Sequence, residues 1–333
     1  MFASRVTVAS LVPPILLAAG LSIASAQSVD QRRTATTTFQ NFVSVEVYAG
    51  YLTGQSREHV YDPDNGRKMS ELFWNINQAA VIGGTLAVTP LPWLTLKAGG
   101  WLPVASNNKM YDYDWLVAPI DEWSDLSQHE NTRMTQAHMV DLGIGVRVFN
   151  FTRPDPDGLR AVSLQVLGGY RWLNMRFEAK GGSFIYSGGG GFRNNIGNFP
   201  ADQMVITYEQ WFNTPYIGLG LNTSYGRWTL SGEVTGSWWA NANDLDNHVM
   251  RTTEFRDSFS KVGMLGLNAR VDYALSEQFS LFGRIDHLRF YDARGPSNAY
   301  DYSAGTLTET TGEAAGAGHY STVVSVGLKA ALR

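Results

Sequence analysis

Hydrophobic and polar residues alternate one by one along much of this chain of 333 residues. This alternation has the period of a β-strand, in which successive side chains point to opposite faces. Each such segment would therefore have one apolar face and one polar face. The clearest cases are segments 43–51, 140–148, 228–238, 265–273 and 324–332.

The lengths of the connections between these segments distinguish two classes of β-protein. A soluble sandwich shows the same alternation, but here short turns alternate with long loops, as in the turn 89–92 and the following stretch 104–134. Short turns at one end and long loops at the other are typical of an outer-membrane barrel. We therefore expect an all-β fold, a ten-stranded antiparallel transmembrane β-barrel with long extracellular loops. The expected strands are 41–53, 70–89, 93–104, 133–150, 159–181, 203–223, 227–241, 258–275, 279–292 and 319–333.

The composition agrees with a membrane barrel and excludes several other classes. Charged residues make up 17% of the chain, below the roughly 25% of soluble domains. A net charge of −4 argues against a nucleic-acid binder that relies on a basic field. The absence of cysteine excludes disulfides, thiolate metal sites and a cysteine nucleophile. Tryptophans near the strand ends are expected to form interfacial girdles, namely Trp74, Trp93, Trp101, Trp115, Trp238 and Trp239.

The first 26 residues have the pattern of a secretory signal. Arg5 precedes an apolar run over 6–23, and small residues follow at 24–26. A membrane anchor is the alternative, but polar residues follow the small ones directly. We expect residues 1–26 to be a removed signal peptide and residues 27–333 to be a single outer-membrane β-barrel domain.

Two clusters of ionisable side chains are candidates for chemistry. Asp112 and Asp114 share one face of an extended chain, so their repulsion would raise one pKa and let the pair hold a proton or orient a water. The alternatives are a solvated acidic rim or a weak calcium site. Asp246 can fix the tautomer of His248, whose other ring nitrogen would act as a general base. The alternative is an exposed loop histidine beside an ordinary aspartate.

The predicted strand order places these two clusters on opposite walls of the barrel, facing each other across its mouth. Several sequence blocks that include them resemble the omptin family of outer-membrane endopeptidases, in the same order and from about residue 45 onward. The blocks are residues 54–61, 66–68 with Trp74, 110–115, 181–186 with 191–193 and 197–200, 215–218, and 244–248.

The resemblance implies a ten-stranded barrel with its active site in an extracellular groove of the outer membrane. It implies that His248, oriented by Asp246, activates a water, and that Asp112 and Asp114 hold or polarise that water and the substrate. No cofactor and no metal are implied. The rival function is a catalytically silent outer-membrane barrel acting as an adhesin or structural protein, which the presence of Asp246 and His248 disfavours.

The resemblance also implies cleavage between basic residues. Glu58 and Asp244 match the pocket for the basic residue before the cut, Asp125 matches an acid near the next pocket, and Met110 and Ile206 match its apolar wall. Two shielded carboxylates would select Arg or Lys. Without the resemblance, the alternative is that both are ordinary exposed loop acids. The expected partners are peptide or protein substrates with Arg or Lys at the cut. We expect a monomer that binds no nucleic acid.

The sequence departs from the family at the contacts with lipopolysaccharide. In omptins, basic residues with a Tyr and a Glu on the outer wall bind lipid A phosphates. Tyr170 matches this set, whereas Trp172 and Asn174 replace a Glu and an Arg, and Trp211 replaces another Arg. Because phosphate binding favours guanidinium groups, dependence on this outer-membrane lipid is doubtful here.

Overall fold

The computed structural model describes residues 43–117, 121–155 and 158–332. These residues form a twelve-stranded antiparallel sheet with one short 3-10 turn, η1 (Val249–Arg251). The strands are β1 (Val43–Tyr61), β2 (Lys68–Leu91), β3 (Leu94–Asp114), β4 (Asp125–Asp155), β5 (Gly158–Lys180), β6 (Ser183–Gly188), β7 (Gly191–Asn198), β8 (Met204–Tyr225), β9 (Trp228–His248), β10 (Thr253–Ala274), β11 (Phe279–Asp301) and β12 (Thr306–Leu332). The expected signal peptide lies outside the described residues.

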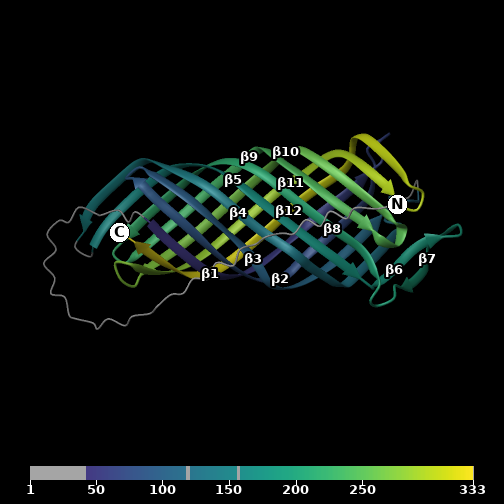
Figure 1. Cartoon of the computed structure of the whole chain (residues 1–333), viewed down its shortest axis with the longest axis horizontal. Helices are drawn as coiled ribbons and strands as arrows, with labels where there is room; N and C mark the ends of the chain where they lie inside the picture. Colours follow the sequence, from purple (N-terminus) through teal and green to yellow (C-terminus); the bar gives the residue numbers. More distant parts are fainter. Residues whose placement is uncertain (1–42, 118–120, 156–157, 333) are drawn as a thin grey trace, which may run out of the picture. The chain divides into compact units, whose positions relative to one another are not determined.

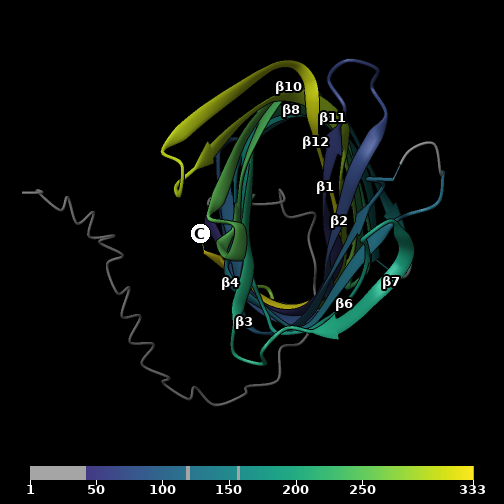
Figure 2. The same cartoon turned by 90° about the vertical axis from the view of Figure 1, so that its right-hand side faces the viewer.

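The sheet closes on itself as a barrel (Figures 1 and 2). Strands follow the order β3-β2-β1-β12-β11-β10-β9-β8-β5-β4, and β3 pairs in turn with β4. The register of β1 with β12 runs from Val43 opposite Leu332 to Val60 opposite Ala315. Closure removes the free strand edges that a lipid environment does not tolerate. The expected all-β antiparallel barrel is therefore confirmed.

The strand count differs from the expected ten because of the glycine-rich segment 181–202. This segment was expected to be a loop, but it contains the hairpin of β6 and β7, and β6 pairs with β4. Figure 1 shows the hairpin projecting from one end of the barrel. In the described part of the chain, no helix is long and apolar enough to cross a membrane.

At the end that carries this hairpin, the strands are longer than the sequence predicted. β3 reaches Asp114 and β4 begins at Asp125, although a loop was expected over 104–134. β9 reaches His248, although a loop was expected over 240–260. In these end segments the strands remain paired, but apolar and polar residues no longer alternate regularly. The alternation in the sequence therefore did not reveal that the strands continue.

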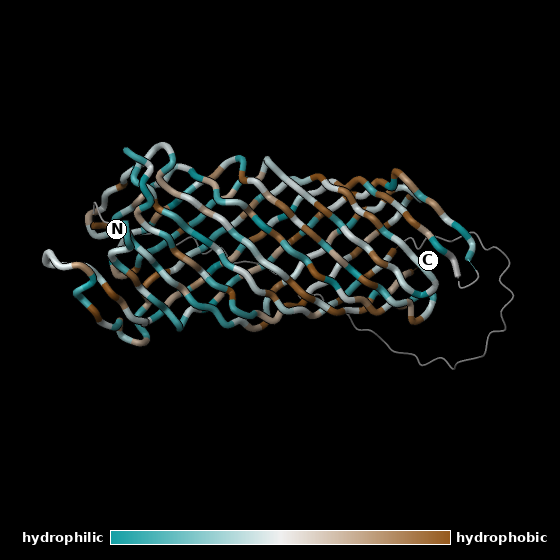
Figure 3. The backbone as a smooth tube through the Cα atoms, turned by 180° about the vertical axis from the view of Figure 1, so that it is seen from behind, coloured by the Kyte–Doolittle hydropathy of each residue, from teal (hydrophilic) through white to brown (hydrophobic). Residues whose placement is uncertain are grey.

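The outer wall carries a band of exposed aliphatic side chains at alternate positions. On β12, for example, Val324, Val326 and Leu328 are 50%, 64% and 50% exposed. Figure 3 shows hydrophobic and hydrophilic residues alternating along the strands. A lipid-facing wall is built in this way, with every second side chain apolar.

Only part of the tryptophan set has the exposed positions that an interfacial girdle requires. Trp93, Trp238 and Trp239 are exposed on the outer surface, and Trp115 lies at the rim beneath the ammonium of Lys68, 3.8 Å from its ring centre. Trp74 and Trp101 are buried instead, so the prediction of interfacial positions for these two was wrong. An aromatic side chain on the inward face of a strand is buried when other side chains fill the inside of the barrel.

Inside the barrel, charged side chains pair between strands that are not neighbours in the sheet. Arg270 of β10 lies 2.8 Å from Glu46 of β1, and Lys97 of β3 lies 2.6 Å from Glu233 of β9. Such pairs across the lumen fill a narrow barrel with side chains.

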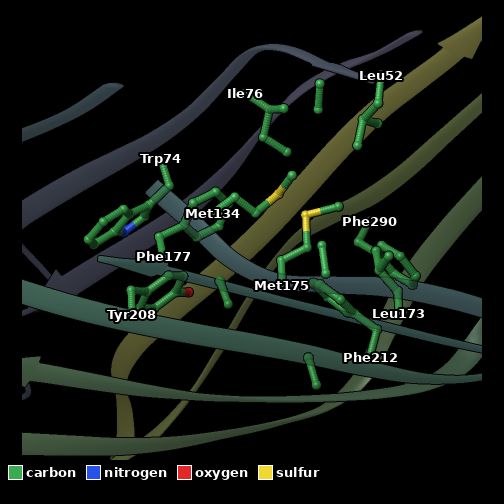
Figure 4. Packing of buried hydrophobic residues seen from close by; sticks show 14 of the residues in the cluster. Leu52, Trp74, Ile76, Met134, Leu173, Met175, Phe177, Tyr208, Phe212 and Phe290 are labelled. Carbon is green, nitrogen blue, oxygen red and sulfur yellow. The ribbon is translucent and has the colours of Figure 1, made fainter. Parts of the chain in front are cut away.

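Buried aromatic and aliphatic side chains from several strands pack together inside the barrel, as Figure 4 shows. Trp74 is fully buried and stacks on Phe177 and Tyr208, with ring centres 5.5 and 5.3 Å away. Tyr208 in turn bonds to an acid of the site described next. This cluster forms the floor of the barrel mouth.

Replacing Trp74 with alanine should lower the free energy of unfolding by about 3–5 kcal/mol, because a large buried aromatic leaves a cavity that the barrel cannot close. Urea titration of the refolded protein in lipid vesicles, followed by the heat-modifiable gel shift, measures this change. Trp93→Ala, on the exposed surface, is the matched control. A Trp74 variant as stable as the control would contradict the packing described.

Candidate active site

Four of the predicted residues come together at the mouth of the barrel. Asp112 and Asp114 lie at the end of β3, and Asp246 and His248 at the end of β9. All three aspartates are buried, so the alternative of a solvated acidic rim does not describe them. β3 and β9 are not neighbours in the sheet, yet the charges of Asp112 and His248 act on each other. The two clusters therefore face one another.

Asp246 holds the imidazole of His248. Its Oδ2 lies 2.6 Å from Nε2 of His248, which leaves Nδ1 as the nitrogen that can accept a proton. Burial lowers the pKa of His248, but Asp246 and then Asp112 outweigh this effect, so the pKa is raised above its ordinary value. The ring is thus a stronger base than a free histidine.

Asp112 and Asp114 are poorly solvated carboxyls. Burial, followed by repulsion from Asp114, raises the pKa of Asp112 to about 7, although the positive charges of His248 and Arg251 oppose the shift. Burial also raises the pKa of Asp114. Ser70 donates a hydrogen bond from Oγ to Oδ1 of Asp112 over 3.2 Å. Such a pair can retain a proton near neutral pH.

A second acidic group lies beside these residues. Glu58 of β1 and Asp244 of β9 are each 2% exposed, so they are not exposed loop acids. Tyr208 donates a hydrogen bond to Oδ2 of Asp244 over 3.0 Å, and Gln210 donates one to the Tyr208 hydroxyl over 3.0 Å. Glu58 Oε2 and Asp244 Oδ1 have no hydrogen-bond partner. Burial raises the pKa of both acids well above the ordinary value.

Two charged residues of the site were missed by the sequence reasoning. Asp257 of β10 is buried and lies directly opposite Asp244. Arg251 is in η1, and its charge lowers the pKa of Asp112, Asp114 and His248. The tight turn at 249–252 could have revealed Asp257, since a symmetric hairpin register around it pairs positions 244 and 257.

The other residues predicted to line the substrate pockets are either hydrogen-bonded or buried. Both carboxylate oxygens of Asp125 are occupied, Oδ2 by the Ser124 hydroxyl at 2.6 Å and Oδ1 by the Ser187 N–H at 3.0 Å. Met110 is fully buried and Ile206 almost so, and both belong to the hydrophobic core of the barrel. Their proposed role in the pocket after the cut stays a prediction.

Of the residues predicted to stand at the lipid-binding positions, Tyr170 and Trp172 are exposed, whereas Asn174 is not. Asn174 is buried and bonded to Glu209 over 2.8 Å. Trp172 packs edge-on against His138, with ring centres 4.4 Å apart. The hydroxyl of Tyr170 donates to Asn213 over 3.0 Å. Among the described residues, no group of three or more His, Cys, Asp or Glu is arranged to hold a metal.

Comparison with known proteins agrees with this geometry. The profile of the omptin family matches residues 39–332. The outer membrane protease OmpP of Escherichia coli is 32% identical over 290 residues, covering 86% of this chain and 89% of OmpP. The plasminogen activator of Yersinia pestis is 31% identical over 287 residues, covering 86% and 88%. The crystal structure of OmpT from Escherichia coli superposes with a TM-score of 0.82 at 28% identity, covering 90% of this chain and 99% of OmpT.

The closed barrel and these relatives place the chain in the class of outer-membrane β-barrel proteases. It belongs to the omptin family. The resemblance found in the sequence is thereby confirmed, and the relatives support protease activity and an outer-membrane location.

Proposed function

We propose that this protein is an endopeptidase that cleaves peptides and proteins at basic, preferably dibasic, sites. The observation that carries the proposal is the pairing of His248 with Asp246, 2.6 Å apart, opposite the buried Asp112 and Asp114. A base with a fixed tautomer then faces a pair of acids that can hold a proton.

In the proposed mechanism, water is the nucleophile. His248 Nδ1 removes a proton from the water as it attacks the scissile carbonyl, while Asp246 stabilises the imidazolium that forms. Asp112 and Asp114 position the water, and the proton that they share stabilises the negative charge developing on the carbonyl oxygen. His248 then returns its proton to the leaving amine.

Substrate preference is proposed to come from the pocket of Glu58 and Asp244. Their unpartnered, buried oxygens would accept hydrogen bonds from the guanidinium or ammonium of the residue before the cut. A neutral side chain would leave these acceptors unsatisfied, which a buried site discriminates against.

We further propose the orientation and processing of the chain. The end bearing the site and the β6–β7 hairpin would face the outside, because outer-membrane barrels keep their longer extensions there. Residues 1–26 would be removed on export, and the mature barrel would act as a monomer.

A pair of fluorogenic peptides tests the proposed specificity. The peptide with Arg-Arg at the cut should be cleaved at least 10²-fold more efficiently, in kcat/KM, than the same peptide with citrulline before the cut, because citrulline keeps the shape and loses the charge. Mass spectrometry of the products locates the cut. Equal cleavage of both peptides would refute basic specificity, and cleavage of neither would favour the silent barrel.

Lipid dependence is expected to be weak. Titrating lipopolysaccharide into detergent-refolded protein should raise kcat/KM only slightly, because Trp172, Asn174 and Trp211 offer no guanidinium to lipid phosphates. Dephosphorylated lipopolysaccharide is the control and should act equally. Strict, saturable dependence on the phosphates would show that another part of the wall binds them.

A further inference from the structure

Three buried carboxylates, each from a different strand, lie together beside Asp246 and His248. Glu58 comes from β1, Asp244 from β9 and Asp257 from β10. All three are buried, with exposed fractions of 2%, 2% and 5%. Asp257 is opposite Asp244 in the register of β9 and β10, so both side chains enter the same space.

Each of the three acids has one buried oxygen without a hydrogen-bond partner, namely Glu58 Oε2, Asp244 Oδ1 and Asp257 Oδ1. The other oxygens of the facing aspartates have partners. Tyr208 donates to Asp244, Ser297 donates to Asp257, and the two carboxyls share a hydrogen bond. A hydrogen bond between two carboxyls requires that one of them keeps its proton.

The groups that act on these three acids are themselves acidic or phenolic. Asp246 on β9, Asp112 on β3 and Tyr208 on β8 face them, and Ser297 on β11 contributes only a hydroxyl. Burial raises the pKa of Asp257 to about 6. This group of carboxylates thus combines acceptors for a cation with a hydrogen bond between two acids, for which one of them must keep its proton.

We propose that Asp257 is a third specificity-determining carboxylate of this pocket, and that entry of a cationic side chain displaces the proton shared by Asp244 and Asp257. The guanidinium or ammonium takes the place of that proton between the two carboxylates, and the proton leaves to solvent. This inference rests on the proposed function, since it assumes that the basic residue before the cut occupies this pocket.

The test measures kcat and KM separately from pH 5 to 8, with the Arg peptide and its citrulline counterpart. For the Arg peptide, KM should fall as the pH rises, by up to about tenfold per pH unit while one proton is released on binding. For the citrulline peptide, KM should stay flat. The slope for the Arg peptide should become shallower in Asp257→Asn, because one of the acids that release a proton is gone, and KM at pH 7.5 should be raised about tenfold or more.

Several controls separate this role from a structural one. Asp257→Glu keeps the charge and should keep the slope. Glu130→Gln removes the same charge from an exposed pair with Lys109 and should change neither constant. The pH profile of kcat should be the same in Asp257→Asn as in the wild type, because Asp257 does not accept the proton of the attacking water. Heat-modifiable gel mobility verifies folding.

The wild-type measurement alone can overturn the inference: it would do so if KM for the Arg peptide did not vary with pH. If KM and its dependence on pH were unchanged in Asp257→Asn, the inference would also be overturned. The proposed specificity for basic residues would then remain valid. Equal cleavage of the Arg and citrulline peptides by the wild type would instead refute the proposed function itself.

Discussion

Replacing His248 with alanine should lower kcat on an Arg-Arg peptide by about 10²–10⁴-fold, the usual contribution of a general base. Asp246 lies 2.6 Å from the imidazole, and in the proposed mechanism alanine would leave the attacking water without a proton acceptor. KM should change little, because the proposed binding pocket for the substrate's basic side chain does not include His248.

The assay uses purified barrel in detergent with lipid, and folding is checked by heat-modifiable gel mobility. His287→Ala is a matched control, since His287 lies on β11 and bonds to Thr322 over 2.9 Å, away from the site. A folded His248→Ala protein with near wild-type cleavage would refute the mechanism and reopen the silent-barrel alternative.

Asp246→Asn should have an effect of similar size, on the order of 10²–10⁴-fold in kcat, because the amide no longer fixes the useful tautomer or stabilises the imidazolium. It should also move the pH profile. Asp246 raises the pKa of His248 against the effect of burial. Without that charge the pKa falls, so the remaining activity should persist to lower pH.

The measurement is kcat from pH 5 to 9 in the wild type and Asp246→Asn. The acid limb of the wild type should lie above the ordinary histidine range, and it should shift toward acid in the variant. Because the charges of His248 and Asp112 act on each other, each limb of the profile reports on the cluster and not on one residue. An acid limb that does not shift in the variant would show that Asp246 does not tune His248.

The barrel could be predicted from the sequence because period-two alternation marks each lipid-facing strand. The ends of the strands could not, because beyond the apolar band nothing in the pattern distinguishes a paired strand from a polar loop. The hairpin of β6 and β7 was missed for the same reason. Trp74 was misplaced because an aromatic near a strand end suits the interface and a packed lumen equally well.

The site was predictable where spacing alone determines geometry. Asp112 and Asp114, or Asp246 and His248, are two positions apart and so share a strand face. Asp257 escaped notice because its role depends on a partner across the hairpin, 13 positions away by the register. Burial is likewise a property of the closed barrel, and it alone turns Glu58 and Asp244 from ordinary acids into unsatisfied acceptors.

The ion pairs inside the lumen have a consequence for how the barrel assembles. Glu46 and Arg270 are separated by 224 positions in the chain, and Lys97 and Glu233 by 136. A partly formed sheet would leave Glu46 and Arg270, whose side chains are only 10% and 12% exposed, without their partners, and an unpaired charge in such a place is costly. Half-closed intermediates should therefore be scarce, and β1 and β12 should join in a single late step that makes insertion slow and all-or-none.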